Sequence, residues 1–211
     1  MRRKLLPLIV PALLGLGVGA ALTALVYALA GWGGGAPESG QAHAGNETLY
    51  AEARTMARAI YEADFAALSA LTHPETGCLF APFSTVDAGA NPVFTPAQVL
   101  AMGTDTTEYV WGSAGPADPP VTLTPAGFFR DILQIRDFAA APCVGFDLVL
   151  RSGNAVENVL EEYPSCHVVD LYCPAGKDPA GTDWASLKLV LADYDGDWKL
   201  VAVVRSVYTE Q

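Results

Sequence analysis

Two apolar-rich segments near the C-terminus give the clearest pattern in this sequence. They are Ser186–Tyr194 and Asp197–Tyr208, and the pair Asp195-Gly196 joins them. Asp-Gly favours a two-residue type I′ turn, because the backbone twist of this turn matches that of two paired strands. The pattern therefore predicts a β-hairpin, and the apolar run His167–Tyr172 is expected as a neighbouring strand of the same sheet.

The turn also predicts which residues of the hairpin face one another. Three cross-strand pairs are expected on one apolar face, as in a sheet that a helix covers: Leu191 with Leu200, Leu189 with Ala202, and Leu187 with Val204. The opposite face is expected to carry Lys188, Lys199 and Arg205 among valines.

A long helix is predicted where the folded region begins. Apolar residues recur at helical spacing from Leu49 to Leu71, with a break at Ala63-Asp64, and Asn46 is a suitable N-cap. His73-Pro74 ends the pattern, because proline disfavours helical backbone in the residue before it.

Shorter elements are expected between the long helix and the C-terminal strands. Strands are predicted over residues 77–83, 108–112 and 121–123, and helices begin at Thr95-Pro96 and Thr124-Pro125. This order predicts an α+β fold, with the helices gathered on one side of a curved antiparallel sheet. The layout is similar to the NTF2-like cone, in which a bent sheet wraps around a long N-terminal helix.

A basic N-terminus precedes the longest apolar run of the chain. Arg2, Arg3 and Lys4 are followed by Leu5–Ala30, which holds no charged residue. At about 1.5 Å per residue this run exceeds the roughly 30 Å of bilayer hydrocarbon, and it is longer than the usual signal-peptide core of about 7–15 residues. We therefore expect a single-pass anchor in the cell membrane, with the N-terminus cytoplasmic and the C-terminal part outside. The alternative is cleavage after Ala28-Leu29-Ala30, which would make the protein secreted.

Three regions follow from these patterns. Residues 1–30 are the predicted signal-anchor or transmembrane helix, 31–45 a flexible linker, and 46–211 one extracytoplasmic α+β domain. Without the three N-terminal basic residues, nine Lys and Arg remain against 23 Asp and Glu, a net charge of −14. Nucleic-acid binders show the opposite balance. The expected partners are therefore the membrane, through the N-terminal helix, and a protein, peptide or envelope component.

Four cysteines lie in the predicted exterior domain: Cys78, Cys143, Cys166 and Cys173. An even count outside the cytoplasm is compatible with two disulfides in three connectivities. Cys166 and Cys173 are not expected to pair with each other, because an odd spacing along one strand sends side chains to opposite faces. The spacing of cysteines and histidines does not fit a metal site, and the sequence contains no cofactor motif.

His73 is a weak catalytic candidate, because histidine can exchange protons near neutral pH. It would need an acid such as Asp131 or Asp183 beside it in a pocket; the alternative is a structural role at the helix end, bonded to terminal carbonyls. Five aromatic residues are candidates for lining a ligand pocket, and burial in the core is the alternative for them: Tyr109, Trp111, Phe128, Phe129 and Trp184.

Several short phrases of the sequence resemble a family of uncharacterised exported domains common in Gram-positive bacteria. They cover most of residues 47–208 in order, and they include His73-Pro74, Phe80-Ala81-Pro82-Phe83, Tyr109-Val110-Trp111-Gly112, Leu123-Thr124-Pro125, Asp183-Trp184 and Gly196-Asp197-Trp198-Lys199-Leu200-Val201. The resemblance implies an exterior location and this fold, and it implies no activity. Members of the family are often lipid-anchored; this chain departs from them, because it has no cysteine at the end of the apolar run.

Together these features predict a membrane-tethered extracytoplasmic domain that binds a ligand, and they favour a binding protein over an enzyme. The alternative function is that of a small-molecule isomerase, dehydratase or hydrolase with an NTF2-like pocket. That alternative rests on fold analogy, and one fold hosts many functions.

Overall fold

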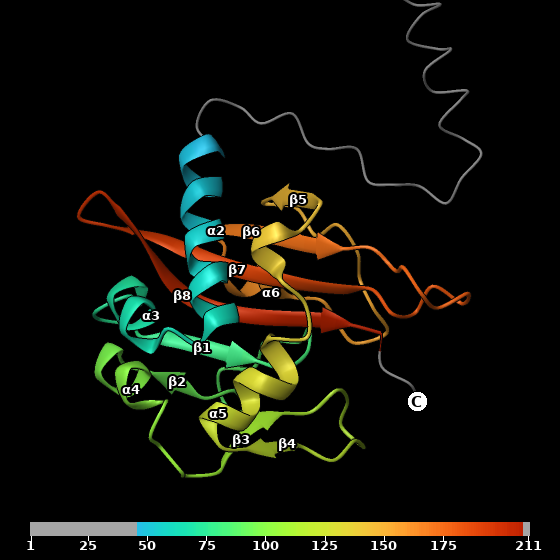
Figure 1. Cartoon of the computed structure of the whole chain (residues 1–211), viewed down its shortest axis with the longest axis horizontal. Coiled ribbons are helices and arrows are strands. Elements are labelled where there is room, and N and C mark those ends of the chain that lie inside the picture. Colours follow the sequence, from blue (N-terminus) through green and yellow to red (C-terminus); the bar gives the residue numbers. More distant parts are fainter. Residues whose placement is uncertain (1–45, 209–211) are drawn as a thin grey trace, which may run out of the picture. The chain divides into compact units, whose positions relative to one another are not determined.

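A curved six-stranded sheet forms the centre of the fold (Figure 1). The computed structural model describes residues 46–208, so the predictions for residues 1–45 lie outside it. The strand order is β2-β1-β8-β7-β6-β5. The strands are β1 Cys78–Ala81, β2 Val93–Phe94, β5 Cys143–Phe146, β6 His167–Cys173, β7 Ala185–Tyr194 and β8 Asp197–Val207.

One pair of strands departs from the predicted antiparallel sheet. β1 runs parallel to β8, whereas the other neighbouring strands are antiparallel. The direction is set before the strand begins, because Thr72 already forms a parallel bridge to Leu200. The α+β class is thus confirmed, and the predicted antiparallel pairing holds in this sheet except between β1 and β8.

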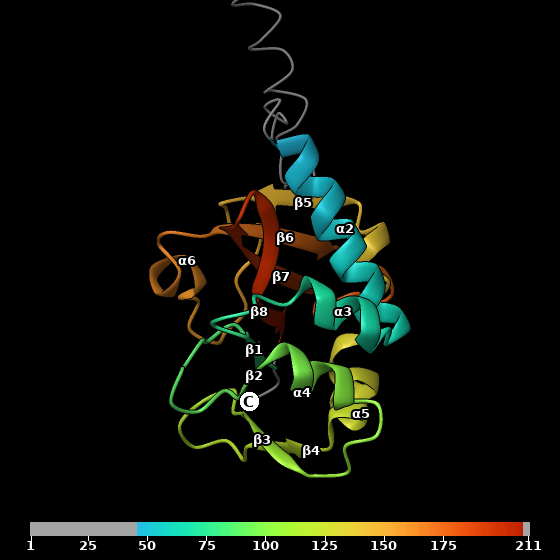
Figure 2. The ribbon, with the colours of Figure 1, turned by 90° about the vertical axis from the view of Figure 1, so that its left-hand side faces the viewer.

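Most helices lie on one face of this sheet, and one short helix lies on the other (Figure 2). On the first face are α2 Asn46–Glu62, α3 Phe65–Leu71, α4 Pro96–Ala101, α5 Pro125–Phe128 and a π-helical turn over Phe129–Leu133; α6 Val159–Glu162 is on the second. A 3₁₀ turn spans Phe138–Ala140, and β3 Tyr109–Gly112 pairs with β4 Val121–Leu123 in a separate ribbon. Within residues 46–208 no helix combines the length and the apolar character that a membrane span needs.

Local sequence signals account for the helix boundaries. The predicted break falls between α2 and α3, where Ala63 has a φ of 52° and the Asp64 carboxylate accepts a hydrogen bond from the Ala67 amide at 3.0 Å. Thr95 and Gln98 form the predicted capping box of α4. A short polar side chain at each start thus satisfies amides that a helix leaves unpaired.

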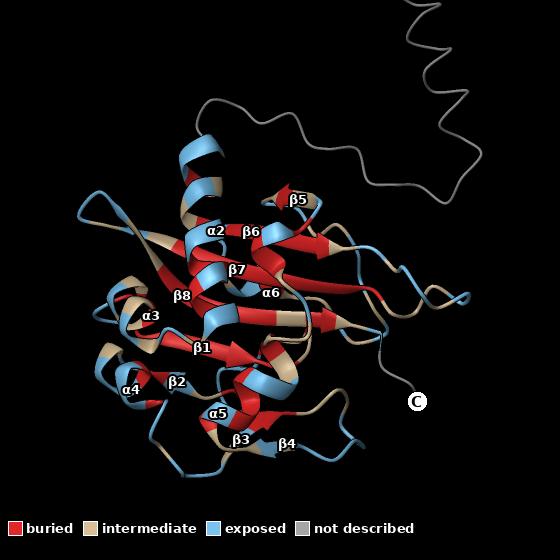
Figure 3. Cartoon of the chain, viewed as in Figure 1, coloured by how far each residue is buried: buried red, intermediate tan, exposed pale blue. Residues whose placement is uncertain are grey.

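The apolar side of α2 packs against the long strands (Figure 3). Leu49, Met56 and Ile60 are at most 3% exposed, and they belong to the same core as Leu189 and Leu191 of β7. A stripe at this spacing places one side of a helix against the sheet and leaves the other side in solvent. The sheet face that α2 covers is therefore apolar, as predicted, but Ala202 and Val204 lie on the opposite face and not on this one.

A β-bulge changes the register of the β7–β8 hairpin. Leu191 faces Leu200 as predicted, but Val201 is an extra residue in β8, so Leu189 faces Val203 and Leu187 faces Arg205. The predicted pairs of Leu189 with Ala202 and of Leu187 with Val204 are therefore wrong. A single inserted residue shifts every later pair of the ladder, and the hydrophobic pattern of the two strands gives no sign of it.

The sheet face opposite α2 is buried as well. Val168, Val190, Ala202 and Val204 are fully buried on it, and Val159 of α6 packs against them. Lys188 was expected on this face among valines, and its side chain is 0% exposed. The central strands are thus covered on both sides, so each polar side chain on them needs a partner inside the protein.

Gly112 lies where β3 passes Asn91. Its φ is +126°, and a Cβ there would lie 2.5 Å from Asn91 Nδ2, which donates a hydrogen bond to the Trp111 carbonyl at 2.7 Å. We predict that Gly112→Ala lowers the free energy of unfolding by about 1–3 kcal/mol, because it combines backbone strain with this contact. Gly196→Ala is the control, because Gly196 has a φ of +86° with open space around it. Urea denaturation measures both, and equal losses would contradict the role of Asn91.

Candidate functional site

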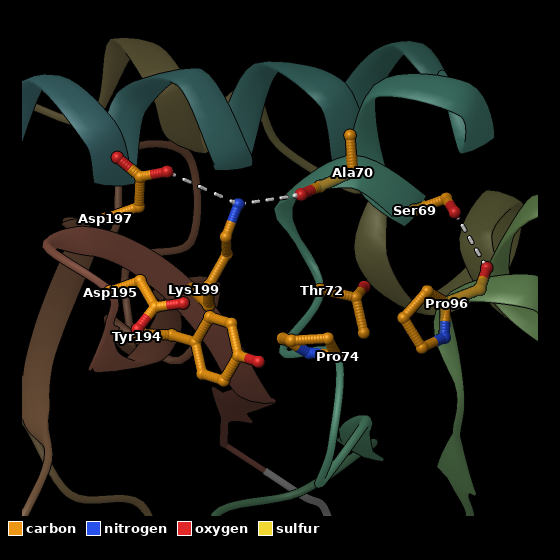
Figure 4. A pocket seen from close by; sticks show the side chains of 9 residues that line it. All are labelled: Ser69, Ala70, Thr72, Pro74, Pro96, Tyr194, Asp195, Asp197 and Lys199. Atoms are coloured by element: carbon orange, nitrogen blue, oxygen red, sulfur yellow. Dashed lines mark hydrogen bonds and ion pairs between the residues drawn. The ribbon is translucent and has the colours of Figure 1, made fainter.

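An open cleft lies between the tip of the β7–β8 hairpin and the loops around α3 and α4 (Figure 4). Its volume is about 360 Å³, and we call it the hairpin cleft. It is lined by Ser69, Ala70, Thr72, Pro74, Pro96, Tyr194, Asp195, Asp197 and Lys199. Ligand pockets usually measure about 300–1,000 Å³, so this cleft can hold a small molecule or one side chain of a partner.

Internal contacts fasten the walls of the hairpin cleft. Lys199 Nζ donates to the Ala70 carbonyl at 3.2 Å and lies 4.0 Å from Asp197 Oδ2. Ser69 Oγ donates to the Pro96 carbonyl at 2.8 Å. These contacts join the hairpin to α3, and α3 to α4. The cleft is therefore preformed by the fold.

His73 lies behind one wall of the hairpin cleft. His73 is only 8% exposed. Its ring packs edge to face against the ring of Tyr194, with the two centroids 5.0 Å apart. Nδ1 accepts hydrogen bonds from the amides of Glu75 at 3.3 Å and Thr76 at 3.2 Å. The charge of Glu75 raises the pKa of Tyr194. His73 thus supports the cleft through a turn, and its ring binds amides rather than the helix carbonyls expected from the sequence.

The two acids proposed as partners of His73 bind other groups. Asp131 forms an exposed ion pair at 2.7 Å with its neighbour Arg130, whose hydrogen bond lowers the pKa of Asp131. Asp183 accepts hydrogen bonds from the amides of Lys177 and Gly176, and the bond from Lys177 is the main cause of its lowered pKa. Among the contacts within residues 46–208, no hydrogen bond or ion pair joins His73 to either acid. The structure does not assemble the three into an acid–base group.

Four of the five candidate pocket aromatics are core residues. Trp111, Phe128, Phe129 and Trp184 are at most 2% exposed, and Tyr109 is half-buried. Trp111 stacks on Phe128 with centroids 3.7 Å apart, whereas Trp184 lies apart from them beneath the guanidinium of Arg151. The hairpin cleft is lined by other residues. Packing accounts for these rings, and a ligand-lining role for them stays a prediction.

One histidine–carboxylate pair had no signal in the sequence. His167 Nδ1 lies 2.9 Å from Asp147 Oδ2, and Asp147 Oδ1 accepts a hydrogen bond from the Val168 amide at 2.9 Å. Asp147 has a φ of +51°, which is uncommon for a residue other than glycine. Both side chains are about half exposed, at 47% for His167 and 50% for Asp147. The residues meet because β5 ends beside the start of β6, which depends on strand pairing rather than on spacing.

A buried polar group on the sheet face opposite α2 was also missed. We call it the polar seam; it consists of Ser84, Asp170, Ser186, Lys188 and Ser206, each at most 1% exposed. Lys188 Nζ donates to Ser206 Oγ and lies 2.8 Å from Glu157 Oε2. Ser84 Oγ donates to Ser206 Oγ at 2.8 Å.

Asp170 occupies the other end of the polar seam. It accepts hydrogen bonds from Ser186 Oγ and, at 2.8 Å, from the Leu150 amide. It faces Lys188 across β6 and β7. Burial raises the pKa of Asp170, and the charge of Lys188 opposes this shift.

The cysteines form no disulfide among residues 46–208. Cys78 is buried, and Cys143, Cys166 and Cys173 are half-buried, all as free thiols. Burial raises the pKa of the Cys78, Cys166 and Cys173 thiols, which lowers their reactivity. In the same range, no three side chains of His, Cys, Asp or Glu are grouped as metal ligands would be.

Comparison with known proteins identifies no family for this chain. No protein-family model and no curated protein matches the chain. Among solved structures, a candidate dehydratase of the NTF2-like family from Streptomyces avermitilis is similar, with a TM-score of 0.30 and 15% sequence identity. The match covers 78% of this chain and 97% of that one. At this TM-score the likeness carries no argument about this chain.

We predict that His73→Ala lowers the free energy of unfolding by about 1–3 kcal/mol, because two amides of a part-buried turn lose their acceptor. His73→Asn should recover part of the loss, since an asparagine side-chain oxygen accepts the same kind of amide bonds in turns. Urea denaturation checks both variants. The control is Glu108→Ala, at an exposed position, and a loss no larger than the control's would show that the Nδ1 contacts contribute nothing.

Asp170 should give stability a specific pH dependence. Because folding raises the pKa of this carboxyl, the native state binds its proton more tightly than the unfolded chain does. The stabilisation that comes with this proton is therefore present at low pH and is lost as the pH rises through the folded-state pKa. We predict that the free energy of unfolding of wild type, minus that of Asp170→Asn, falls as the pH rises from about 4. Denaturant unfolding at several pH values measures it, and a difference that grows with pH would contradict the assignment.

Proposed function

We propose that this protein is a membrane-tethered extracytoplasmic domain that binds a protein or peptide segment of the cell envelope. The basic N-terminus, the long apolar run and the net charge of −14 on the rest of the chain support the location. The hairpin cleft is the feature that most directly supports a binding role. It is open and preformed, and Lys199 and Ser69 in its walls donate hydrogen bonds to main-chain carbonyls.

The lining of the hairpin cleft suits contact with a polypeptide. Tyr194 extends toward Pro74, and Pro96 forms the far wall (Figure 4). Asp195 and Asp197 add carboxylates on the hairpin side. A tyrosine with a polar tip is a frequent anchor residue in protein interfaces, because it adds large contact area at a low entropy cost.

A finer proposal concerns the fold family. We infer an NTF2-like arrangement from the long helix α2, which packs along the core face of the sheet, and from the phrases shared with exported domains of Gram-positive bacteria. An isomerase, dehydratase or hydrolase would need a titratable group directed into a pocket. His73, Asp131 and Asp183 instead have structural partners, so we do not propose catalysis.

Cell fractionation tests the location. We predict that the full chain is recovered with membranes after a carbonate wash, that N-terminal sequencing finds Met1 or the residue after it, and that protease added outside intact cells degrades the domain. An N-terminus after Ala30 would indicate secretion instead of anchoring. Recovery of the full chain in the cytosol would contradict the proposal.

Substitution in the hairpin cleft tests the binding role. We predict that Tyr194→Ala lowers the amount of envelope protein or peptide that cross-links to the full chain by about tenfold, as loss of an anchor residue does. Tyr61→Ala is the control, because Tyr61 is 39% exposed and lies on α2, away from the cleft lining. Equal cross-linking by the two variants would show that the hairpin cleft is not part of the binding surface.

A further inference from the structure

A segment without helix or strand crosses the sheet face opposite α2. It comprises residues 147–158, between β5 and α6, and we call it the strap. Its ends are held by the Asp147–His167 pair and by Asn158, whose side chain bonds the amide and carbonyl of Val86 at 2.8 and 2.9 Å. Between these ends, the Leu150 amide donates to Asp170.

Polar and apolar contacts both attach the strap, and Val149 packs against the buried valines of this sheet face. Leu148 is 52% exposed and Val156 is 69% exposed, so these apolar side chains face solvent rather than the sheet. Arg151 reaches the Tyr172 hydroxyl at 3.2 Å. Water can replace hydrogen bonds near the protein surface such as the one from Arg151. The strap is therefore a candidate for local opening.

Glu157 of the strap reaches the polar seam. Its side chain is 13% exposed, and its Oε2 lies 2.8 Å from Lys188 Nζ, which is fully buried. A buried ammonium needs an anion beside it. Asp170 faces the same lysine, but it is engaged with Ser186 and Leu150, and Glu157 is the carboxylate in ion-pair contact with Nζ.

The two partners of the Lys188–Glu157 ion pair differ in the regularity of their backbone and in the number of hydrogen bonds they form. Lys188 and Ser206 are in the paired central strands β7 and β8, whereas Glu157 is in the irregular strap. Both carboxylate oxygens of Glu157 are buried and neither has a hydrogen-bond partner among the described residues, so the contact of Oε2 with Lys188 is an ion pair alone. The sheet thus offers a fixed ammonium and hydroxyl, and the strap fills that position with an incompletely bonded carboxylate.

We propose that Lys188 and Ser206 form a carboxylate-binding site, and that Glu157 occupies it as an internal ligand which an external carboxylate replaces when the strap lifts. This site is separate from the hairpin cleft and does not rest on the proposed function. Ser206 Oγ accepts a hydrogen bond from Lys188 Nζ and so holds the ammonium in place, and an ammonium forms strong charge-assisted hydrogen bonds with a carboxylate. The external ligand is a small organic acid or an acidic side chain of a peptide.

Removal of the internal ligand tests the site. The full-length Glu157→Ala variant is melted in sodium acetate and in sodium chloride of equal ionic strength. It should melt several degrees below wild type in chloride, and acetate should raise its melting temperature with the logarithm of concentration, as a ligand of the native state does. Glu161→Ala, an exposed carboxylate of α6, is the control, and its melting temperature should rise less in acetate than that of Glu157→Ala.

Three outcomes are decisive. An acetate-specific rise supports a small-acid site, and a larger rise with the peptide Asn-Ala-Val-Glu-Asn-Val than with its glutamine counterpart supports an acidic segment. Equal melting in all these conditions overturns the proposal, because Glu157 is then only a structural counter-ion. If the variant does not fold in chloride, the yield of folded protein on dilution from urea into each salt replaces the melting temperature, with the same expectation.

Proteolysis tests whether the strap lifts in the unchanged protein. Arg151 is a trypsin site within the strap, and the masses of the fragments identify cleavage after it. Acetate should speed this cleavage of the wild-type chain relative to chloride, because it competes with Glu157. An equal rate in the two salts would overturn the role of Glu157 as a replaceable ligand, even if the site itself accepts acetate.

Discussion

The ion pair between Lys188 and Glu157 is the interaction on which the sheet face opposite α2 depends. Removing one partner of a buried ion pair costs about 3–5 kcal/mol, whereas an exposed pair contributes about 0–1 kcal/mol. A well-packed apolar side chain in place of both charges is often no less stable. The pair therefore does more for position than for stability: it requires the strap, through Glu157, to lie over β7 and β8.

The polar seam in turn depends on the register of the central hairpin. Asp195-Gly196 sets the turn, with φ values of 56° and 86°, and Val201 adds one residue to β8. After that bulge, Lys188 faces Val204 and Ser186 faces Ser206. Lys188 and Ser206 are then diagonal neighbours on one face, within reach of each other. In a hairpin without the bulge, Lys188 would face a different residue, and the contacts of the polar seam between Lys188 and Ser206 would be lost.

Local signals in the sequence predicted much of the fold. The break at Ala63-Asp64, the capping box of Thr95 and Gln98, and the Asp-Gly turn each act within four residues, so the sequence alone predicts them. The parallel pairing of β1 with β8 and the bulge at Val201 depend on contacts between distant segments. The spacing of apolar residues carries no information about such contacts. The sequence therefore predicted neither the parallel pairing nor the bulge.

The candidate sites were harder to predict than the fold, for the same reason. His73 was singled out for its chemistry, and it supports the hairpin cleft from behind without entering it. Tyr194 and Lys199 looked like ordinary strand residues, and they line the cleft only because α3 packs beside the hairpin tip. Lys188 looked like a residue of a valine-rich strand face, because nothing in residues 147–158 indicated that the strap returns across the sheet.

The protein has two candidate binding surfaces that differ in how open they are. The hairpin cleft is open and preformed, whereas the polar seam is closed by the strap. Polar contacts to the sheet fasten the strap. Amide hydrogen exchange of Leu150, measured by NMR on the full chain, tests it most directly, because that amide donates to the buried Asp170. We expect this amide to exchange at least about 100-fold more slowly than in an unstructured peptide. Exchange at the unstructured rate would contradict it.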